Sequence, residues 1–178
     1  MKLLRLLGVL FFALQIFSAQ PKNILFVGNS YLYYNNSVHN YVEPMLREHH
    51  EYEIETKLSA IGGSKLHHHN IDHLLNPKNL NLDQQIDLLI MQGGSTEVVS
   101  EKDQEKFIQT VQQYSAKAQK LGVKTALYMT HAFTEADRRF EPNLIKKISK
   151  TYHAAGKESN SIVIPVGLAY EIAYKERP

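Results

Sequence analysis

Short apolar runs alternate with amphipathic segments along the chain after residue 22. Consecutive or alternating apolar residues predict strands over 23–27, 52–58, 87–91, 124–129 and 161–166. Apolar residues spaced three and four positions apart predict helices over 37–50, 65–75, 101–121 and 142–155. A strand followed by a helix, repeated along the chain, indicates an α/β fold with a parallel sheet and right-handed crossovers.

The predicted helix over 101–121 is the clearest of these elements, because its apolar residues form one stripe. Ser100 with Asp103 is expected to cap its start, and Gly122 is expected to end it in a left-handed conformation. The stripe consists of Phe107, Val111, Tyr114, Ala118 and Leu121.

Proline and glycine set the limits expected for two other helices. Pro142 and Gly156 are expected to bound the helix over 142–155. Pro44 falls inside the window 37–50, so that helix is expected to start late or to be kinked.

The composition of the strands predicts their order. The runs at 24–27, 88–91 and 126–129 are continuously apolar, as central strands covered on both faces must be. The second strand alternates charged and apolar residues, and the fifth contains Pro165, so both are expected at edges. The predicted fold is a three-layer α/β/α sandwich with a five-stranded parallel sheet in the order 2-1-3-4-5, as in flavodoxin-like proteins.

Polar groups follow four of the predicted strands. Ser30, the pair Gly62 and Gly63, Gln92 and His131 come after the first, second, third and fourth strands. Ligands of such sheets bind beyond the carboxyl ends of the strands, where the strand order reverses. Each residue alone is explained by a simpler role: a helix cap for Ser30, a tight turn for the glycines, a strand end for Gln92 and a surface histidine for His131. Together on one edge they suggest a nucleophile with hydrogen-bond donors for an oxyanion.

Four segments resemble the conserved blocks of the SGNH (GDSL-type) hydrolases. VGNSYLYYNN resembles the first block, in the variant where Gly-Asn-Ser replaces Gly-Asp-Ser, and IGGSKL resembles the second. LLIMQGGS is similar to the third block in members that use glutamine, and IVIPVGLAYEIAY to the fifth strand and following helix start. The resemblance implies an esterase that needs no metal or other cofactor. Ser30 would be the nucleophile, and the backbone N–H groups of Ser30 and Gly63 with the Gln92 amide would bind the oxyanion.

The same resemblance implies a general base in an Asp-x-x-His block after the fifth strand, and the sequence contains no such block. Three interpretations remain. The favoured one is that the domain is incomplete at its C-terminus. The second is that the chain is a non-catalytic relative of the family. The third is that His131 serves as the base.

The run LHHHNIDH raises a separate metal hypothesis. His69 and His73 lie four residues apart, so a continuous helix would present both on one face. No third ligand is evident and the chain has no cysteine, so the favoured interpretation is a histidine-rich helix in which one imidazole lines the crevice.

The first 19 residues have the pattern of a secretory signal peptide, with Lys2 and Arg5 before a short apolar run, and this interpretation is favoured over an uncleaved anchor or a buried core helix. We therefore expect a secreted or periplasmic protein with one domain over 20–178 and no stable membrane insertion after signal cleavage. A net charge of +2 without a basic stripe argues against nucleic acid as a partner.

The tyrosines and asparagines at 31–36 suit an acylated carbohydrate or another small ester as substrate. The rival function is a non-catalytic domain that binds a small molecule or carbohydrate on the same scaffold.

Overall fold

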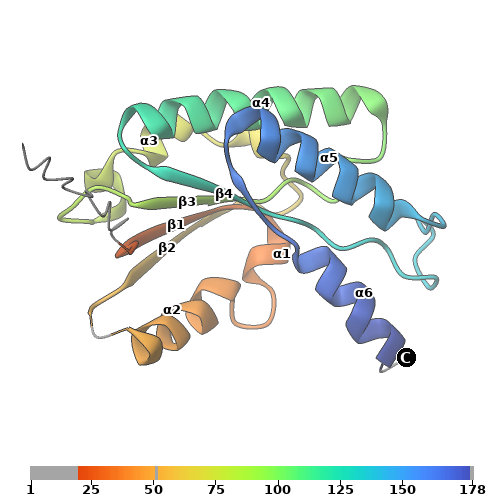
Figure 1. Ribbon diagram of the computed structural model, residues 1–178, viewed down its shortest axis with the longest axis horizontal. Helices are drawn as coiled ribbons and strands as arrows, with labels where there is room; N and C mark the ends of the chain where they lie inside the picture. Colours follow the sequence, from red (N-terminus) through yellow and green to blue (C-terminus); the bar gives the residue numbers. More distant parts are fainter. Residues whose placement is uncertain (1–19, 51, 177–178) are drawn as a thin grey trace, which may run out of the picture.

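The computed structural model describes residues 20–50 and 52–176 and contains one five-stranded sheet (Figure 1). All neighbouring strands pair in parallel, in the order β2-β1-β3-β4-β5. The predicted fold class and strand order are therefore confirmed. The strands are β1 (Asn23–Gly28), β2 (Glu55–Ala60), β3 (Leu88–Met91), β4 (Lys124–Tyr128) and β5 (Ile162–Ile164).

Helices cover both faces of the sheet, which gives the three expected layers (Figure 1). α3, α4 and α5 lie on one face, and α1, α2 and α6 lie on the other. Three of the helices are long: α2 (Val38–His49), α4 (Glu101–Lys120) and α5 (Leu144–Ser159). The others are α1 (Ser30–Tyr33), α3 (Ile71–Leu74), α6 (Val166–Glu176) and the 3₁₀ turns η1 (Leu66–His68) and η2 (Pro77–Leu80).

The central strand β1 supplies both hydrophobic cores, because its side chains alternate between the two faces. Leu25 and Val27 join the larger core, which includes apolar residues of α4 and α5. Ile24 and Phe26 join the smaller core, against which Val42 and Leu46 of α2 pack. Burial on both faces explains why the first strand is continuously apolar, and the strand order places β1 between β2 and β3.

Both predicted edge strands occupy the edges. Ile162 of β5 is 66% exposed, and the strand ends at Ile164, directly before Pro165. Because Pro165 has no N–H to donate, the ladder cannot continue through it.

The clearest predicted helix has the expected caps. The hydroxyl of Ser100 accepts a hydrogen bond from the Asp103 N–H at 3.1 Å, at the start of α4. Gly122 adopts a φ of +79° just beyond the helix. The helix predicted over 37–50 does not start late as expected, because α2 begins at Val38 and contains Pro44. Pro44 is exposed, so water can satisfy the carbonyl that loses its helical partner.

The single helix predicted over 65–75 is wrong. The segment divides into η1 and α3, because His69 is extended and the side chain of Asn70 caps a new helix by accepting from the His73 N–H at 3.2 Å. His69 and His73 therefore do not share one helical face.

The expected end at Gly156 is also wrong, because α5 continues to Ser159 and ends at Asn160, which has a φ of 51°. A Cβ atom on Gly156 would lie 2.7 Å from Cγ2 of Val163 and 2.9 Å from the carbonyl oxygen of Ser161. Gly156 thus lets the helix approach β5 closely and does not terminate it.

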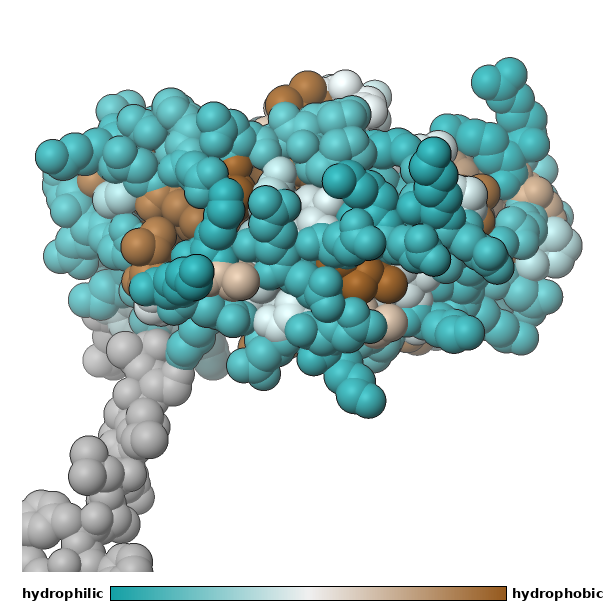
Figure 2. All heavy atoms as spheres, turned by 90° about the horizontal axis from the view of Figure 1, so that it is seen from above, coloured by the Kyte–Doolittle hydropathy of each residue, from teal (hydrophilic) through white to brown (hydrophobic). Residues whose placement is uncertain are grey.

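The helical face seen from above in Figure 2 carries mostly hydrophilic side chains with small apolar patches. Among residues 20–50 and 52–176, no helix combines the length and apolar character needed to cross a membrane. The predicted signal peptide over 1–19 lies outside the described residues.

We predict that Gly156→Ala lowers the free energy of unfolding by about 1–2 kcal/mol, because overpacking outweighs the better helix propensity of alanine. Urea denaturation measures the change. The control is Lys157→Ala at the exposed next position of α5. A Gly156→Ala variant as stable as the wild type would contradict the close approach of α5 to β5.

Candidate active site

Ser30 lies at the first position of α1, directly after the central strand β1. Asn29 caps this short helix, since its Oδ1 accepts from the Tyr31 N–H at 3.1 Å. Gly28 leaves no room for a side chain, because a Cβ there would lie 2.5 Å from Oε1 of Gln92. The turn after β1 therefore presents a half-buried serine hydroxyl at the carboxyl edge of the sheet.

A glycine turn follows the neighbouring strand β2. The Ile61 N–H donates to the Gly28 carbonyl at 3.1 Å, so the turn begins beside the end of β1. Gly63 has a φ of +69° and is exposed, a conformation that favours glycine. The side-chain amide of Asn29 donates to the Ser64 carbonyl at 3.1 Å and ties the turn to the segment that carries Ser30.

The backbone donors left unused at this edge include those of Ser30 and Gly63. Within the described parts of the chain, the N–H groups of Ser30 and Gly63 donate to no protein acceptor. They belong to turns that follow two paired strands, with Gly28 opposite Ala60 in the register. Two such donors at adjacent strand ends can bind a developing oxyanion.

Gln92 follows β3 and lies beneath the turn that carries Ser30. Its side chain is 1% exposed, and its Oε1 accepts from the Asn29 N–H at 3.0 Å. Its Nε2 donates to the carbonyl of Gly93. The amide is thus oriented by contacts at both ends, and the turns after β1, β2 and β3 meet around Asn29 and Gln92.

His131 lies beyond the end of β4, between two tyrosine rings. Its ring centroid is 4.6 Å from that of Tyr31 and 4.8 Å from that of Tyr170 in α6. Burial lowers the pKa of His131, while the nearby Glu171 opposes that change. The residue therefore favours the neutral imidazole beside the tyrosine that follows Ser30.

The histidine run contributes one buried imidazole to the site. Nε2 of His69 lies 2.9 Å from the Gly28 carbonyl and 3.3 Å from the Ser64 hydroxyl. Burial is the main cause of its lowered pKa. His73 instead contacts the side chain of Asn79 at 3.1 Å. In the part of the chain that the structure describes, no three His, Cys, Asp or Glu residues form a group that could hold a metal.

Sequence reasoning missed two residues that join these turns, Asn29 and Glu97. Asn29 is buried and bonds to the turns after β2 and β3. Glu97 is 1% exposed and accepts from the N–H groups of Leu66 and Gly94. A lone acid close behind a glycine pair was the available signal for Glu97, although charged residues in such loops are usually exposed.

Cavities are present at both ends of the strands. One of about 660 Å³ is at the opposite edge from Ser30, lined by residues that include Lys22, Glu43 and Asp83. One of about 340 Å³ is lined by Thr96, Phe133, Arg139 and other residues of the segments after β3 and β4. The second is on the same edge as Ser30, so it is the better candidate for accommodating part of a substrate.

We predict that lowering the pH from 7 to 5 destabilises the protein partly through His131. Its folded pKa lies below the unfolded value of about 6.5, so protons bind preferentially to the unfolded chain as the pH falls through that value. His131→Phe keeps an aromatic ring between the tyrosines and removes the titrating group. Urea unfolding at both pH values should give a smaller loss of stability for this variant than for the wild type. An equal loss would contradict the buried neutral state of His131.

No family model and no curated protein matches the chain in sequence. Several solved structures match its fold. AlinE4, an SGNH-hydrolase family esterase, has a TM-score of 0.65 and 16% identity over 90% of this chain and 82% of its own. The acetyl xylan esterase AlAXEase has a TM-score of 0.62 and 21% identity over 86% of this chain and 83% of its own.

A variant of the acetyl xylan esterase Axe2 from Geobacillus stearothermophilus has a TM-score of 0.60 and 13% identity, over 86% of this chain and 80% of its own. These structures share the parallel α/β architecture over most of both chains. The chain therefore has the fold of the SGNH hydrolases.

Proposed function

We propose that the protein is a serine esterase that removes O-acetyl or similar acyl groups from carbohydrate. The main support is that the N–H groups of Ser30 and Gly63 donate to no acceptor among the described residues and lie on two turns that Asn29 joins. The structures of similar fold include an esterase and two acetyl xylan esterases.

In the proposed reaction, Oγ of Ser30 attacks the ester carbonyl carbon and gives its proton to a general base. The carbonyl oxygen becomes an oxyanion and accepts hydrogen bonds from the N–H groups of Ser30 and Gly63. The alcohol then leaves with the proton from the base, and a water molecule cleaves the acyl–Ser30 ester by the same steps in reverse.

Gln92 is the proposed third oxyanion donor. Its Oε1 is held by the Asn29 N–H, and its Nε2 faces the Gly93 carbonyl. An amide nitrogen carries two hydrogens, so one bond to Gly93 leaves a second hydrogen for the oxyanion. A neutral amide also donates without having a proton to lose.

The proposed base is a histidine. His131 is a candidate because its ring packs on Tyr31, the neighbour of Ser30, and favours the neutral form that can accept a proton. The alternative is a histidine of an Asp-x-x-His block outside this sequence.

A carbohydrate substrate is supported by the surface beside Ser30. Tyr34 is 63% exposed and Tyr33 is also exposed, so their rings can stack on the C–H faces of a sugar. Asn35 and Asn36 are exposed and left-handed, and their amides can bond hydroxyl groups. Export through the predicted signal peptide would bring the enzyme to extracellular or periplasmic glycans.

The second candidate function is carbohydrate binding without turnover. One observation favours it: in residues 20–50 and 52–176 no histidine forms a hydrogen bond with the Ser30 hydroxyl. Without a base, the donors alone would give only weak residual catalysis.

A fluorophosphonate probe distinguishes the two functions. Attack by Ser30 would form an oxygen–phosphorus bond and release fluoride, so peptide mass spectrometry should find the phosphonyl group on Ser30. Ser30→Ala should abolish the labelling. A folded wild-type protein that is never labelled would favour the binding function and reject the esterase.

We predict that Gln92→Ala lowers kcat about a hundredfold, because one oxyanion donor typically contributes about 3 kcal/mol to transition-state stabilisation. Gln92→Glu keeps an acceptor for the Asn29 N–H and loses the amide donor, so it should be at least as slow. Ester hydrolysis and melting temperature are measured for both variants. An unchanged kcat in Gln92→Ala would contradict the role of Gln92 as an oxyanion donor. A lower kcat in Gln92→Ala with a normal kcat in Gln92→Glu would contradict it as well.

A further inference from the structure

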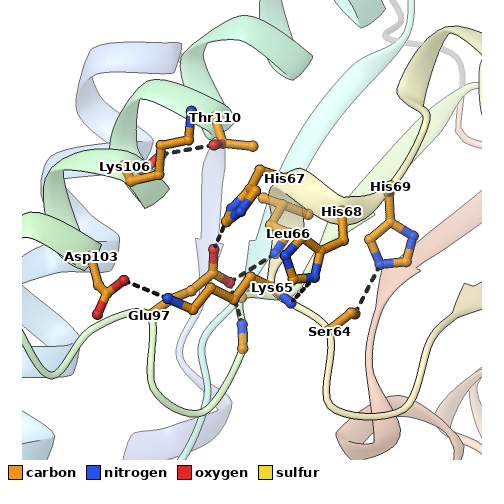
Figure 3. Close-up of polar contacts among 12 residues, drawn as sticks. Ser64, Lys65, Leu66, His67, His68, His69, Glu97, Asp103, Lys106 and Thr110 are labelled. Carbon is orange, nitrogen blue, oxygen red and sulfur yellow. Dashed lines mark hydrogen bonds and ion pairs between the residues drawn. The ribbon is translucent and has the colours of Figure 1, made fainter.

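Glu97 is a buried carboxyl group that the proposed reaction does not use. It follows the Gly93–Gly94 turn after β3 and is 1% exposed (Figure 3). Burying a carboxyl group is costly unless its oxygens are hydrogen-bonded. Burial raises the pKa of Glu97, although bonds to Gly94 and Leu66 act in the opposite direction. Its location therefore needs an explanation.

One oxygen of Glu97 joins two turns of the candidate site. Oε2 accepts from the Leu66 N–H at 2.9 Å and from the Gly94 N–H at 2.5 Å. Leu66 lies three residues after Gly63, and Gly94 belongs to the turn that follows Gln92. A Cβ on Gly94 would lie 2.8 Å from the Ser64 carbonyl oxygen, so the two turns are already in contact at this point.

The other oxygen faces a histidine. Oε1 of Glu97 and Nδ1 of His67 are 3.7 Å apart, and neither atom forms a hydrogen bond with another of the described residues (Figure 3). Nearby, Lys65 bonds to Asp103 of α4 at 2.5 Å and holds the same segment from the outside. Oε2 is therefore the only oxygen of Glu97 that hydrogen-bonds to the described backbone. These two bonds require an acceptor oxygen, whether or not the carboxyl group is ionised.

We propose that Glu97 is a positioning residue for the oxyanion hole: its Oε2 fixes the turn over 62–66 against the turn over 93–94 and thereby sets the location of the Gly63 N–H. This inference rests on the proposed esterase function. Glu97 does not touch the reacting atoms, and it acts only through the backbone of Leu66 and Gly94. A glutamine at this position keeps the acceptor oxygen, whereas an alanine removes it.

The test compares Glu97→Ala and Glu97→Gln with the matched control Glu43→Ala. Glu43 also accepts two hydrogen bonds with one oxygen, from the N–H of Thr56 at 3.0 Å and from its hydroxyl at 2.7 Å. These bonds lie at the start of β2, away from the glycine turn. Glu43→Ala therefore removes a comparable carboxylate acceptor, here one that joins α2 to β2, without touching the site.

Two measurements are made on each variant. Amide hydrogen exchange reports whether the N–H groups of Leu66 and Gly94 remain hydrogen-bonded. Fluorophosphonate labelling of Ser30 is separated into reversible binding of the probe and the rate constant of bond formation, which depends on the oxyanion donors. A role limited to folding would lower the melting temperature without changing that rate constant in the folded protein.

We expect Glu97→Ala to accelerate exchange at both amides and to slow bond formation about a hundredfold, as for loss of an oxyanion donor. Probe binding should change little. In Glu97→Gln the rate constant of bond formation should lie within about tenfold of the wild-type value. Glu43→Ala should change neither amide exchange at Leu66 and Gly94 nor the labelling of Ser30. If Glu97→Ala does not fold, Glu97→Asp replaces it, because its shorter side chain withdraws the acceptor oxygen.

Normal labelling in Glu97→Ala would overturn the proposal, as would a Glu97→Gln variant as slow as Glu97→Ala. A wild-type protein that is never labelled would instead reject the esterase function. In that case exchange at Leu66 and Gly94 still decides whether Glu97 joins the two turns: unchanged exchange in Glu97→Ala rejects the link itself.

Discussion

The hydrogen bonds of Asn29 are the interaction on which the candidate site depends. Its N–H donates to Gln92 after β3, its side-chain amide donates to Ser64 after β2, and its Oδ1 caps the helix that begins with Ser30. One buried residue therefore connects the ends of three neighbouring strands. A parallel sheet brings these ends to one edge, and Asn29 determines how the turns meet there.

Glycine and buried polar groups complete this arrangement. Gly28 allows Gln92 to lie directly beneath the turn. Gly63 has a left-handed conformation, and its N–H donates to no acceptor among the described residues. Glu97 joins the segment after this second turn to the segment after β3. Because these polar groups are hydrogen-bonded within the protein, the turns that carry the Ser30 and Gly63 N–H groups are held in place before a substrate binds, which is the preorganisation that oxyanion binding needs.

Much of the fold could be predicted from the sequence, because strand burial leaves a direct record in residue type. Continuous apolar runs identified the central strands, and Pro165 identified an edge. The errors arose where tertiary contacts override local pattern. Gly156 looks like a helix end, but close contact with Val163 requires it inside α5. The periodicity over 65–75 suggests one helix, but burial of His69 beneath Gly28 and the cap formed by Asn70 divide it.

The candidate site was predictable only in part for a related reason. Ser30, Gly63, Gln92 and His131 each follow a strand, so topology alone brings them to one edge. The contacts of Asn29 and Glu97 join segments far apart in the sequence, and no local pattern reports such pairings. The protein resembles known esterases in its fold, and a shared fold does not determine chemistry. Function depends on the few groups around Ser30.

The most direct test of the central claim is a crystal structure of the protein with an alkyl boronic acid, which forms a tetrahedral anion with an activated serine. We expect a bond from boron to Oγ of Ser30, with one boronate oxygen about 3 Å from the backbone nitrogens of both Ser30 and Gly63. A boronate bound to Ser30 whose oxygens avoid both nitrogens would contradict the account.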